Sequence, residues 1–378
     1  RNGDLKVGDE ICTPFNGVQK VAQLFPQGVK KIYKMYLLDG RIAEATEEHL
    51  WTFRTNKQRD KYVNSDRSDK TRWTFTETTA QLMKRLQRGE RLYLPTNDPI
   101  EFEQKDLPID PYVLGVLIGD GCLTESAWQS TKKVLISNAE EDVVRMFAEC
   151  INASRVVSGR TNFNRYVYTD QASELHNILA TMGLCTYSYN KFIPHEYLFS
   201  SIEQRKELLA GLFDTDGCVD DGSFRFTTTS ERLRDDVLHL VRSLGYNATW
   251  TKDKRAYKYT SGVCYDVFIR TSDEIFHSKK HKERYAEYLT RKGKNFRRAN
   301  CHNRIVKIEY DRMEEAQCLY INDRDHLYMI DDFVVTHNTF GSILSVAEPC
   351  LDPLFRATFF RRTFGQLKQA GGIVDDMK

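Results

Sequence analysis

The stretch Leu208-Leu-Ala-Gly-Leu-Phe-Asp-Thr-Asp-Gly217 decides the fold of the middle of the chain, and Tyr112-Val-Leu-Gly-Val-Leu-Ile-Gly-Asp-Gly121 repeats its pattern. Each stretch predicts an apolar helix with a glycine near its centre and Asp-Gly at its end. Gly115 and Gly211 remove side chains, so the two helices can approach each other closely. We therefore expect the paired helices to bring Asp120 and Asp216 together at one end.

The sequence around these stretches also repeats, between about residues 107 and 290. Both copies have the pattern helix, strand, helix, strand, strand, helix. After its apolar helix, the first copy is predicted to continue with segments 134–137, 140–151, 155–157, 166–168 and 173–182. The second is predicted to continue with segments 223–227, 231–244, 248–250, 265–269 and 273–289.

Two neighbouring carboxylates repel each other unless a divalent cation lies between them. Mg²⁺ prefers oxygen ligands, and it can bridge phosphates and activate water. The two stretches also resemble the signature of LAGLIDADG endonucleases. The resemblance implies a pseudo-twofold αββαββα endonuclease with repeats 107–190 and 191–298. It also implies Mg²⁺ at Asp120 and Asp216, and a monomer that cuts a long, non-palindromic site in double-stranded DNA.

Lys191, in Lys191-Phe-Ile-Pro194, resembles the lysine block before the second signature helix, where it would polarise a phosphate or the attacking water. A surface lysine that caps a turn fits the sequence equally well. Basic residues that alternate with aromatic ones on the repeat strands suit readout of the major groove. These candidates are Arg155, Arg160, Arg225 and Lys254. Lys279 and Lys280 either contact phosphates or lie on a solvated helix face.

The flanking segments predict short strands. They include residues 20–25, 31–38 and 49–53 near the N-terminus, and 304–309, 318–321 and 326–329 near the C-terminus. Residues 55–72 are charged and polar, which predicts a surface loop. Residues 78–88 predict a helix with a threonine cap and with Leu82, Met83 and Leu86 on one face.

The string Val334-Val-Thr-His-Asn-Thr339 suits a peptide-cleaving reaction. The Asn338 side-chain amide can attack its own carbonyl carbon, form a succinimide and release Thr339. His337 can give a proton to the departing amine, and Thr339 offers a hydroxyl nucleophile directly after the scissile bond.

This string and three others resemble, in order, the motifs of inteins. They are Asp4-Leu-Lys-Val-Gly-Asp-Glu-Ile11, Thr46-Glu-Glu-His49, the strand 318–329, and His337-Asn338. The resemblance implies a horseshoe-like, all-β Hint splicing domain made of residues 1–100 and 301–338, in which Thr46 and His49 promote an acyl shift at the upstream junction. The overall class is α+β multidomain. Asp323 or Asn322 would occupy the position of the acid in the penultimate motif.

The family's first-residue Cys or Ser has no counterpart at Arg1, so we expect it upstream. The chain alone is then predicted to cleave after Asn338 but not to splice. Residues 339–378 are expected to be host protein, joined to the splicing domain in cis. The string Thr358-Phe-Phe-Arg-Arg-Thr-Phe-Gly-Gln-Leu367 resembles the ATPase of phage terminase large subunits. In that family Thr339 would complete a phosphate-binding loop after splicing.

The length, charge and composition of the chain limit the classes of protein to which it can belong. A chain of 378 residues is long enough for two or three domains, and a formal net charge of +2 gives no sign of a nucleic-acid partner. No apolar run approaches the roughly 18 residues of a membrane span. The nine cysteines include no Cys-x-x-Cys pair, which predicts reduced thiols and a cytoplasmic protein without a membrane partner.

Three other classes fit parts of the sequence. They are a terminase ATPase with an inactive insertion, a DNA-binding regulator that keeps the repeat fold without cutting, and a hedgehog-like autoprocessing domain. The Asn338-Thr339 end argues against the first and the third, and the two acids argue against the second.

Overall fold

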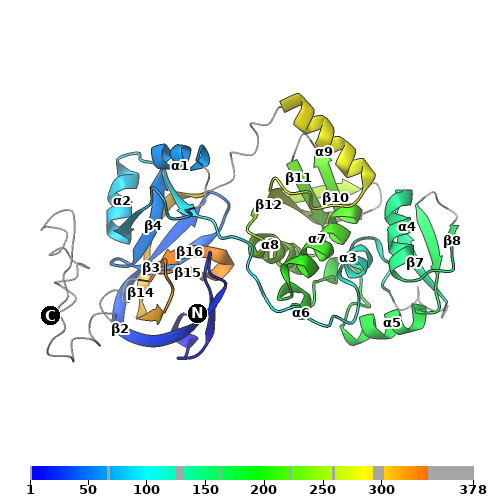
Figure 1. Cartoon of the computed structure of the whole chain (residues 1–378), viewed down its shortest axis with the longest axis horizontal. Coiled ribbons are helices and arrows are strands. Elements are labelled where there is room, and N and C mark those ends of the chain that lie inside the picture. The colour runs from blue at the N-terminus through cyan, green and yellow to red at the C-terminus, as the bar shows by residue number, and fades with distance from the viewer. Residues whose placement is uncertain are drawn as a thin grey trace, which may run out of the picture. The chain divides into compact units, whose positions relative to one another are not determined.

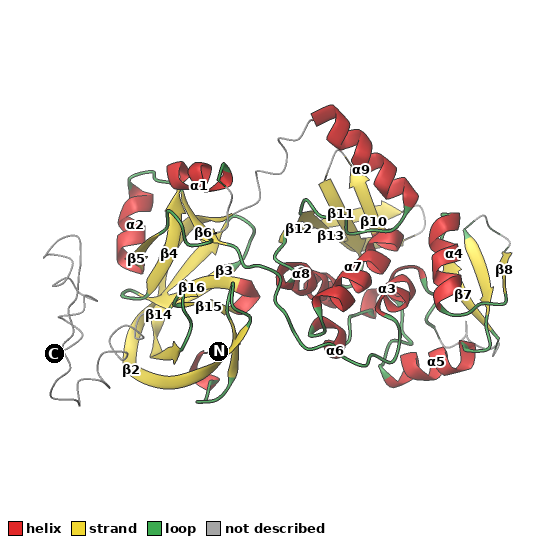
Figure 2. Ribbon diagram, viewed as in Figure 1, coloured by secondary structure: helices red, strands yellow, loops and turns green. Residues whose placement is uncertain are grey.

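The chain divides into two compact units, one formed by residues 1–100 with 301–378 and the other by residues 101–300. The computed structural model describes residues 2–65, 69–124, 132–159, 161, 163–220, 223–257, 260–292 and 302–338 (Figures 1 and 2). Residues 101–106, which we expected between the units, belong to the second. Gln204 fixes them there, because its amide accepts from the Lys105 N–H at 3.1 Å and donates to the Lys105 carbonyl at 2.6 Å.

The first unit combines strands from both ends of the chain with two short helices. Its elements are β1 (Glu10–Cys12), β2 (Val18–Leu37), β3 (Ile42–Thr46), β4 (Leu50–Thr55), α1 (Asn56–Val63), β5 (Phe75–Thr78), α2 (Thr79–Gln87), β6 (Leu92–Pro95), β14 (His302–Ile321), β15 (Leu327–Ile330) and β16 (Val334–His337). Within the described residues, the larger sheet has the order β1-β2-β14-β6-β4-β5, with β3 on β2, and β15 pairs with β16.

The antiparallel pair β2 and β14 joins the two ends of the chain, with residues 21–37 paired along residues 305–321. Figure 1 shows the two strands side by side in the first unit. The sequence predicts two short strands, 20–25 and 31–38, in place of β2. Strand β2 stays continuous because β14 changes register between Ala316 and Gln317, opposite Pro26. The shift accommodates this proline, which has no N–H to donate to the neighbouring strand.

The helices of this unit confirm one prediction and correct another. Helix α2 starts at the expected place, because Thr78 accepts from the Gln81 N–H while the Gln81 side chain accepts from the Thr78 N–H. Helix α1 occupies part of the expected loop 55–72, so the unit is not all-β. Its residue Tyr62 is buried, and the guanidinium of Arg54 lies 3.8 Å from the centre of the Tyr62 ring. One buried aromatic contact therefore outweighs the polar composition of the segment.

The turn before β16 has an unusual backbone that the sequence did not reveal. Asp332 and Phe333 have φ of 59° and 58°, a left-handed backbone region that residues other than glycine rarely adopt. The buried guanidinium of Arg41 holds this turn by donating to the Asp332 carbonyl at 2.8 Å and to the Phe333 carbonyl at 3.0 Å. The turn directs β16 back along β15, towards Asn338.

The second unit contains the predicted repeat. Its first copy consists of α3 (Pro111–Asp120), β7 (Lys133–Ser137), α4 (Glu141–Cys150), β8 (Arg155–Ser158), β9 (Asn164–Tyr168) and α5 (Ala172–Thr181). After α6 (His195–Leu198), the second copy consists of α7 (Ile202–Asp216), β10 (Gly217–Asp220), β11 (Ser223–Thr228), α8 (Glu231–Ser243), β12 (Asn247–Tyr257), β13 (Thr260–Arg270) and α9 (Lys279–Lys292). The sheets have the orders β7-β9-β8 and β10-β11-β13-β12.

The second copy has the full αββαββα order, whereas the described part of the first shows only a single bridge, Gly121 with Ile136, in place of the first hairpin. Helix α9 was predicted to start at residue 273 but starts at Lys279. The reason is Asp214, whose carboxylate accepts the N–H groups of His277 and Ser278 at 3.0–3.1 Å and so holds the preceding segment out of the helix.

Helices α3 and α7 pack through their glycines. A Cβ placed on Gly115 would lie 2.5 Å from the Leu208 carbonyl oxygen, and one on Gly211 would lie 2.3 Å from the Tyr112 carbonyl oxygen. Residues 112–118 of α3 and 208–213 of α7 are all buried, and their apolar side chains form the centre of the unit's hydrophobic core. Across the described residues, no helix is long and apolar enough to cross a membrane.

Candidate functional site

The two helices α3 and α7 end at the predicted acids of the second unit. Asp120 and Asp216 are the last residues of these helices, and both side chains are half-buried. Burial, together with the charge of Asp216, raises the pKa of Asp120 to about 7. Burial raises the pKa of Asp216 to about 6. The charge of Asp216 thus acts on the carboxyl of Asp120.

Lys191 lies at the same place and is buried, so it is not a lysine that caps a surface turn. Its ammonium donates to the carbonyl oxygens of Gly119 at 3.0 Å and of Gly121 at 3.2 Å, on either side of Asp120. Burial lowers the pKa of Lys191, while the charges of Asp216 and Asp120 raise it. The lysine thus places a positive charge beside both acids.

Asn138 is a residue of this site that the sequence did not single out. Its amide donates to the Asp120 carboxylate at 2.7 Å, which opposes the rise in the pKa of that acid. Asn138 directly follows strand β7, and its side-chain Oδ1 accepts the Glu140 N–H at 2.7 Å. Nothing in its local sequence distinguishes it from an ordinary helix-capping asparagine.

The acid pair suits a hard divalent cation. A cation between two carboxylates offsets the repulsion between their charges. Carboxylate oxygens are also the ligands that Mg²⁺ prefers. Among the described residues, no third acid, histidine or cysteine joins them in a metal-sized cluster. The remaining ligands of such an ion would come from water, from backbone or from the phosphates of a substrate.

The strands of both copies carry the expected mixture of basic and aromatic side chains. Exposed Arg155 on β8 lies over the Tyr168 ring at 4.2 Å, and Lys133 on β7 lies 4.6 Å from the centre of the Tyr166 ring. Arg225 on β11 is half-buried. Arg160 and the side chain of Lys254 lie outside the described residues.

The two lysines predicted near the start of α9 contact acidic residues of the first copy. The Lys280 ammonium forms an ion pair with Glu140 at 2.6 Å, and the Lys279 N–H donates to Asp142 at 2.6 Å. Both side chains are exposed. Lys280 is therefore already paired with an acid, and any contact of it with phosphate competes with Glu140.

In the first unit, His49 lies against β16, the strand that leads to Asn338. Its Nε2 forms a hydrogen bond with the hydroxyl of Thr336, a buried residue of β16. Its ring stands edge-on to Trp51, with ring centres 5.1 Å apart. The His49 N–H donates to the Thr46 carbonyl at 3.3 Å and so closes the Thr46–His49 turn. Loss of water around the ring lowers the pKa of His49 to about 4.

Asn338 is buried and held from two sides. Its N–H donates to the His326 carbonyl at 2.7 Å, and its side-chain amide donates to the Ile321 carbonyl at 3.3 Å. Its Oδ1 is buried and accepts no hydrogen bond from the described residues. His337 precedes it, as the last residue of β16. Thr339 and the expected host segment 339–378 lie outside the described residues.

Asp323 fixes the loop that supports Asn338. It is buried, and its carboxylate accepts from the Asn16 amide at 2.7 Å and from the N–H groups of Asp325 and Leu327 at 3.1 and 3.3 Å. The neighbouring Asn322 is exposed. His326, which the sequence did not single out, has φ of 54°, and its ring centre lies 6.3 Å from that of His337.

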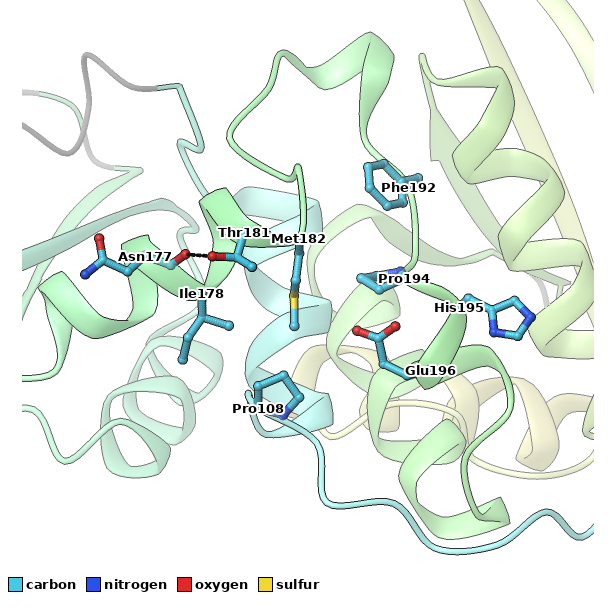
Figure 3. A pocket seen from close by; sticks show the side chains of 9 residues that line it. All are labelled: Pro108, Asn177, Ile178, Thr181, Met182, Phe192, Pro194, His195 and Glu196. Carbon is cyan, nitrogen blue, oxygen red and sulfur yellow. Dashed lines mark hydrogen bonds between the residues drawn. The ribbon is translucent and has the colours of Figure 1, made fainter.

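One pocket of the second unit lies apart from these groups. It has a volume of about 610 Å³ and is lined by residues of α5 and of the segment 192–196, with Pro108 (Figure 3). Neither of the paired acids nor Lys191 lines it. We therefore place the candidate sites at the acid pair and at Asn338, not in this pocket.

Comparison with known protein families gives a match to one part of the chain. Residues 203–293, which run from α7 to α9, match the profile of the LAGLIDADG-like domain. The solved structure of the homing endonuclease I-DmoI in complex with DNA and Ca is similar to 48% of this chain over 96% of its own, with 14% identity and a TM-score of 0.32. A score this low does not by itself establish a shared fold.

Two curated relatives are named as replicative DNA helicase DnaB. The protein from Mycobacterium intracellulare is 29% identical over 359 residues, which cover 89% of this chain and 55% of the relative. The protein from Synechocystis is 28% identical over 254 residues, which cover 62% of this chain and 26% of the relative. The chain thus spans about half the length of the first relative. Neither match supports the terminase host that residues 358–367 suggested.

Proposed function

We propose that the chain is an intein: a self-splicing domain formed by both ends of the sequence, with an inserted LAGLIDADG-type DNA endonuclease. The observation that supports splicing is the contact of His49 with Thr336, because it joins the Thr46–His49 turn to the strand that ends directly before Asn338. The profile match at residues 203–293 and the acid pair at the ends of α3 and α7 support the endonuclease.

The cleavage step at Asn338 balances within the chain. The side-chain nitrogen of Asn338 forms a bond to its own carbonyl carbon and loses a proton, while the bond from that carbon to the Thr339 nitrogen breaks. His337 supplies the proton that the departing amine takes up. The Ile321 carbonyl holds the attacking nitrogen, and the His326 carbonyl holds the backbone N–H of Asn338.

Mass spectrometry of the purified chain tests this step. We expect slow release of the peptide 339–378, and we expect Asn338→Ala to abolish it. Asn64→Ala is the matched control, because this exposed asparagine directly follows α1 in the same unit and has no proposed part in the cleavage. Release that persists in Asn338→Ala would rule out asparagine cyclisation.

For DNA cleavage, Asp120 and Asp216 would hold the cation, Asn138 would orient Asp120, and Lys191 would hold positive charge beside both acids. A bound Mg²⁺ supplies a charge that offsets the carboxylates and polarises a phosphate oxygen or water. The target is proposed to be a long, non-palindromic site in the uninterrupted host gene. Exposed cations on the strands, such as Arg155, would contact it.

A plasmid with the uninterrupted host gene tests the endonuclease in the presence of Mg²⁺. Asp120→Asn and Asp216→Asn should each remove most cleavage and leave the fold intact. Asp170→Asn, an exposed acid of the same unit, should cut at the rate of the unchanged protein. Full cleavage by either of the first two variants would contradict a shared cation. Binding of the plasmid without cutting by the unchanged protein would favour a DNA-binding regulator.

The host is proposed to be an ATP-driven DNA motor. The string 358–367 favours a terminase large subunit, and the curated relatives favour a replicative helicase. In the terminase case the insertion separates a phosphate-binding loop from Thr339, so an unspliceable full-length precursor should not hydrolyse ATP. Normal turnover by that precursor would refute the proposal. Assays of DNA packaging and of strand unwinding by the spliced host would distinguish the two motors.

A further inference from the structure

The hydrogen bond between His49 and Thr336 has a consequence for the upstream centre. His49 is held on several sides. Thr79, the first residue of α2, donates its N–H to the His49 carbonyl at 2.9 Å, and Trp51 lies edge-on to the ring. The Thr79 hydroxyl in turn accepts from the Trp51 indole N–H at 3.0 Å. These contacts fix the backbone and the ring plane of His49. The hydrogen bond with Thr336 bears on which ring nitrogen carries the proton.

A neutral imidazole carries its proton on only one nitrogen, and the hydrogen bond made by the other nitrogen decides which. The low pKa of His49 keeps its ring neutral at neutral pH. If the Thr336 hydroxyl donates to Nε2, the proton must be on Nδ1. If Nε2 donates to the hydroxyl, Nδ1 has only a lone pair and cannot give a proton to a peptide nitrogen.

We propose that Thr336 is a positioning residue that donates its hydroxyl hydrogen to His49 Nε2 and so keeps His49 in the Nδ1–H form. This inference rests on the proposed splicing function, in which His49 assists the acyl shift at the upstream junction. Only the Nδ1–H form leaves a proton donor on the nitrogen that Thr336 does not occupy. Thr336 acts through His49 and touches no reacting atom itself.

The hydrogen bond between His49 and Thr336 also links the proposed upstream step to the cleavage after Asn338. Thr336 lies opposite Tyr328 in the β15–β16 pair, two residues before Asn338. The hydroxyl that fixes His49 is therefore carried by β16, the strand that leads directly to Asn338, so both proposed centres depend on this strand.

Nitrogen NMR of the full chain tests the tautomer directly, with the His49 signals assigned by comparison with His49→Ala. We expect the Nδ1–H form in the unchanged protein and in Thr336→Ser. In Thr336→Val, which keeps the shape of the side chain and lacks the hydroxyl, we expect the Nε2–H form or a mixture. An Nε2–H form in the unchanged protein, or an unaltered spectrum in Thr336→Val, would overturn the proposal.

Cleavage assays test the consequence. Upstream cleavage is measured with hydroxylamine on the full-length precursor in an Asn338→Ala background, and downstream cleavage as release of 339–378 from the chain itself. Thr336→Val should slow the upstream step at least about tenfold, because a general acid contributes roughly 10²–10⁴ to a rate. The downstream step should change less than about threefold, and Thr336→Ser should restore the upstream step.

The matched control is Thr52→Val, which removes another buried hydroxyl of the same unit, hydrogen-bonded to Thr76 at 3.1 Å. Equal losses of both cleavages in Thr336→Val, matched by Thr52→Val, would mean that Thr336 only stabilises the fold, and the proposal would fall. If the Asn338→Ala precursor shows no upstream cleavage at all, the splicing function itself fails. The NMR spectrum distinguishes the two cases, because it needs no activity.

Discussion

Replacement of Gly115 by alanine should separate the two helices that carry the acids. The new Cβ would lie 2.5 Å from the Leu208 carbonyl oxygen, 2.8 Å from the Leu212 nitrogen and 2.9 Å from the Gly211 Cα. All three are backbone atoms, so no side chain can rotate away to make room. Because Cβ contacts below 3.0 Å essentially never occur, α3 and α7 must separate by about half an ångström or more.

The size of the effect follows from two opposing terms. Overpacking of a close-packed core costs about 1–3 kcal/mol, and alanine recovers up to about 1 kcal/mol over glycine within a helix. We therefore expect Gly115→Ala to lower the free energy of unfolding by about 1–2 kcal/mol. Gly211→Ala should cost as much or more, since its Cβ would lie 2.3 Å from the Tyr112 carbonyl oxygen. The double variant should be non-additive, because both changes act on one contact.

Activity should fall further than stability. Each glycine lies five residues before the acid that ends its helix, so a separation at the glycines moves Asp120 relative to Asp216. A misplacement of about 1 Å at a reacting centre can cost about 10² in rate, and half of that should cost at least about tenfold. The assay is Mg²⁺-dependent cleavage of the plasmid, measured well below the unfolding transition.

The control for the chemical change is Gly262→Ala on β13, where a Cβ would meet nothing within 4 Å. Its unfolding free energy should stay within about 0.5 kcal/mol of the unchanged protein. The reasoning is refuted if Gly115→Ala matches this control in stability and cuts DNA at the original rate. The two helices would then not be in backbone contact at their glycines.

Three other predictions follow from the two sites. Because Asp120 and Asp216 have pKa values raised to about 7 and 6, Mg²⁺ affinity measured by calorimetry should fall as pH drops through that range, and the metal-free second unit should lose stability as pH rises from about 4 to 7; a flat profile would contradict the acid pair. Because the pKa of His49 is lowered to about 4, its contribution to the stability of the first unit is present above about pH 6.5 and lost on acidification, so in a chain whose second unit is replaced by a short linker, unfolding at pH 5 should cost about 1–2 kcal/mol less than at pH 7, a difference that His49→Gln should remove. Replacing residues 101–300 by a short Gly-Ser linker should leave a folded first unit that still releases 339–378; an aggregated product would show that the unit needs the insertion.

The sequence predicted best where one helix or one motif determined the structure. The glycine-centred helices, their terminal acids and the threonine cap of α2 all depend on residues that are neighbours in the chain. It failed where a distant group decided the local structure. Asp214 holds residues 277 and 278 out of α9, and Arg41 holds a strained turn that begins almost 300 residues later.

The two candidate sites differ in the same way. Asp120, Asp216 and Lys191 could be proposed from repeated or flanking motifs, because each belongs to a recognisable string. Asn138, His326 and Thr336 could not, since each contributes through one contact that only the folded backbone creates. A residue type as common as asparagine or threonine gives no signal of such a contact in one sequence.

The pairing of β6 with β14 explains how one chain can hold two such sites. His302 pairs with Pro95, so the chain leaves the first unit and returns to it on neighbouring strands of one sheet. The entropy of closing a loop grows only slowly with its length, so a long segment between these strands costs the first unit little more than a short one. The acid pair, in turn, depends on α3 and α7, which both lie within residues 101–300. Each site is therefore built from contacts inside its own unit. A substitution that abolishes DNA cleavage should leave peptide cleavage at Asn338 intact, and one that abolishes peptide cleavage should leave DNA cleavage intact.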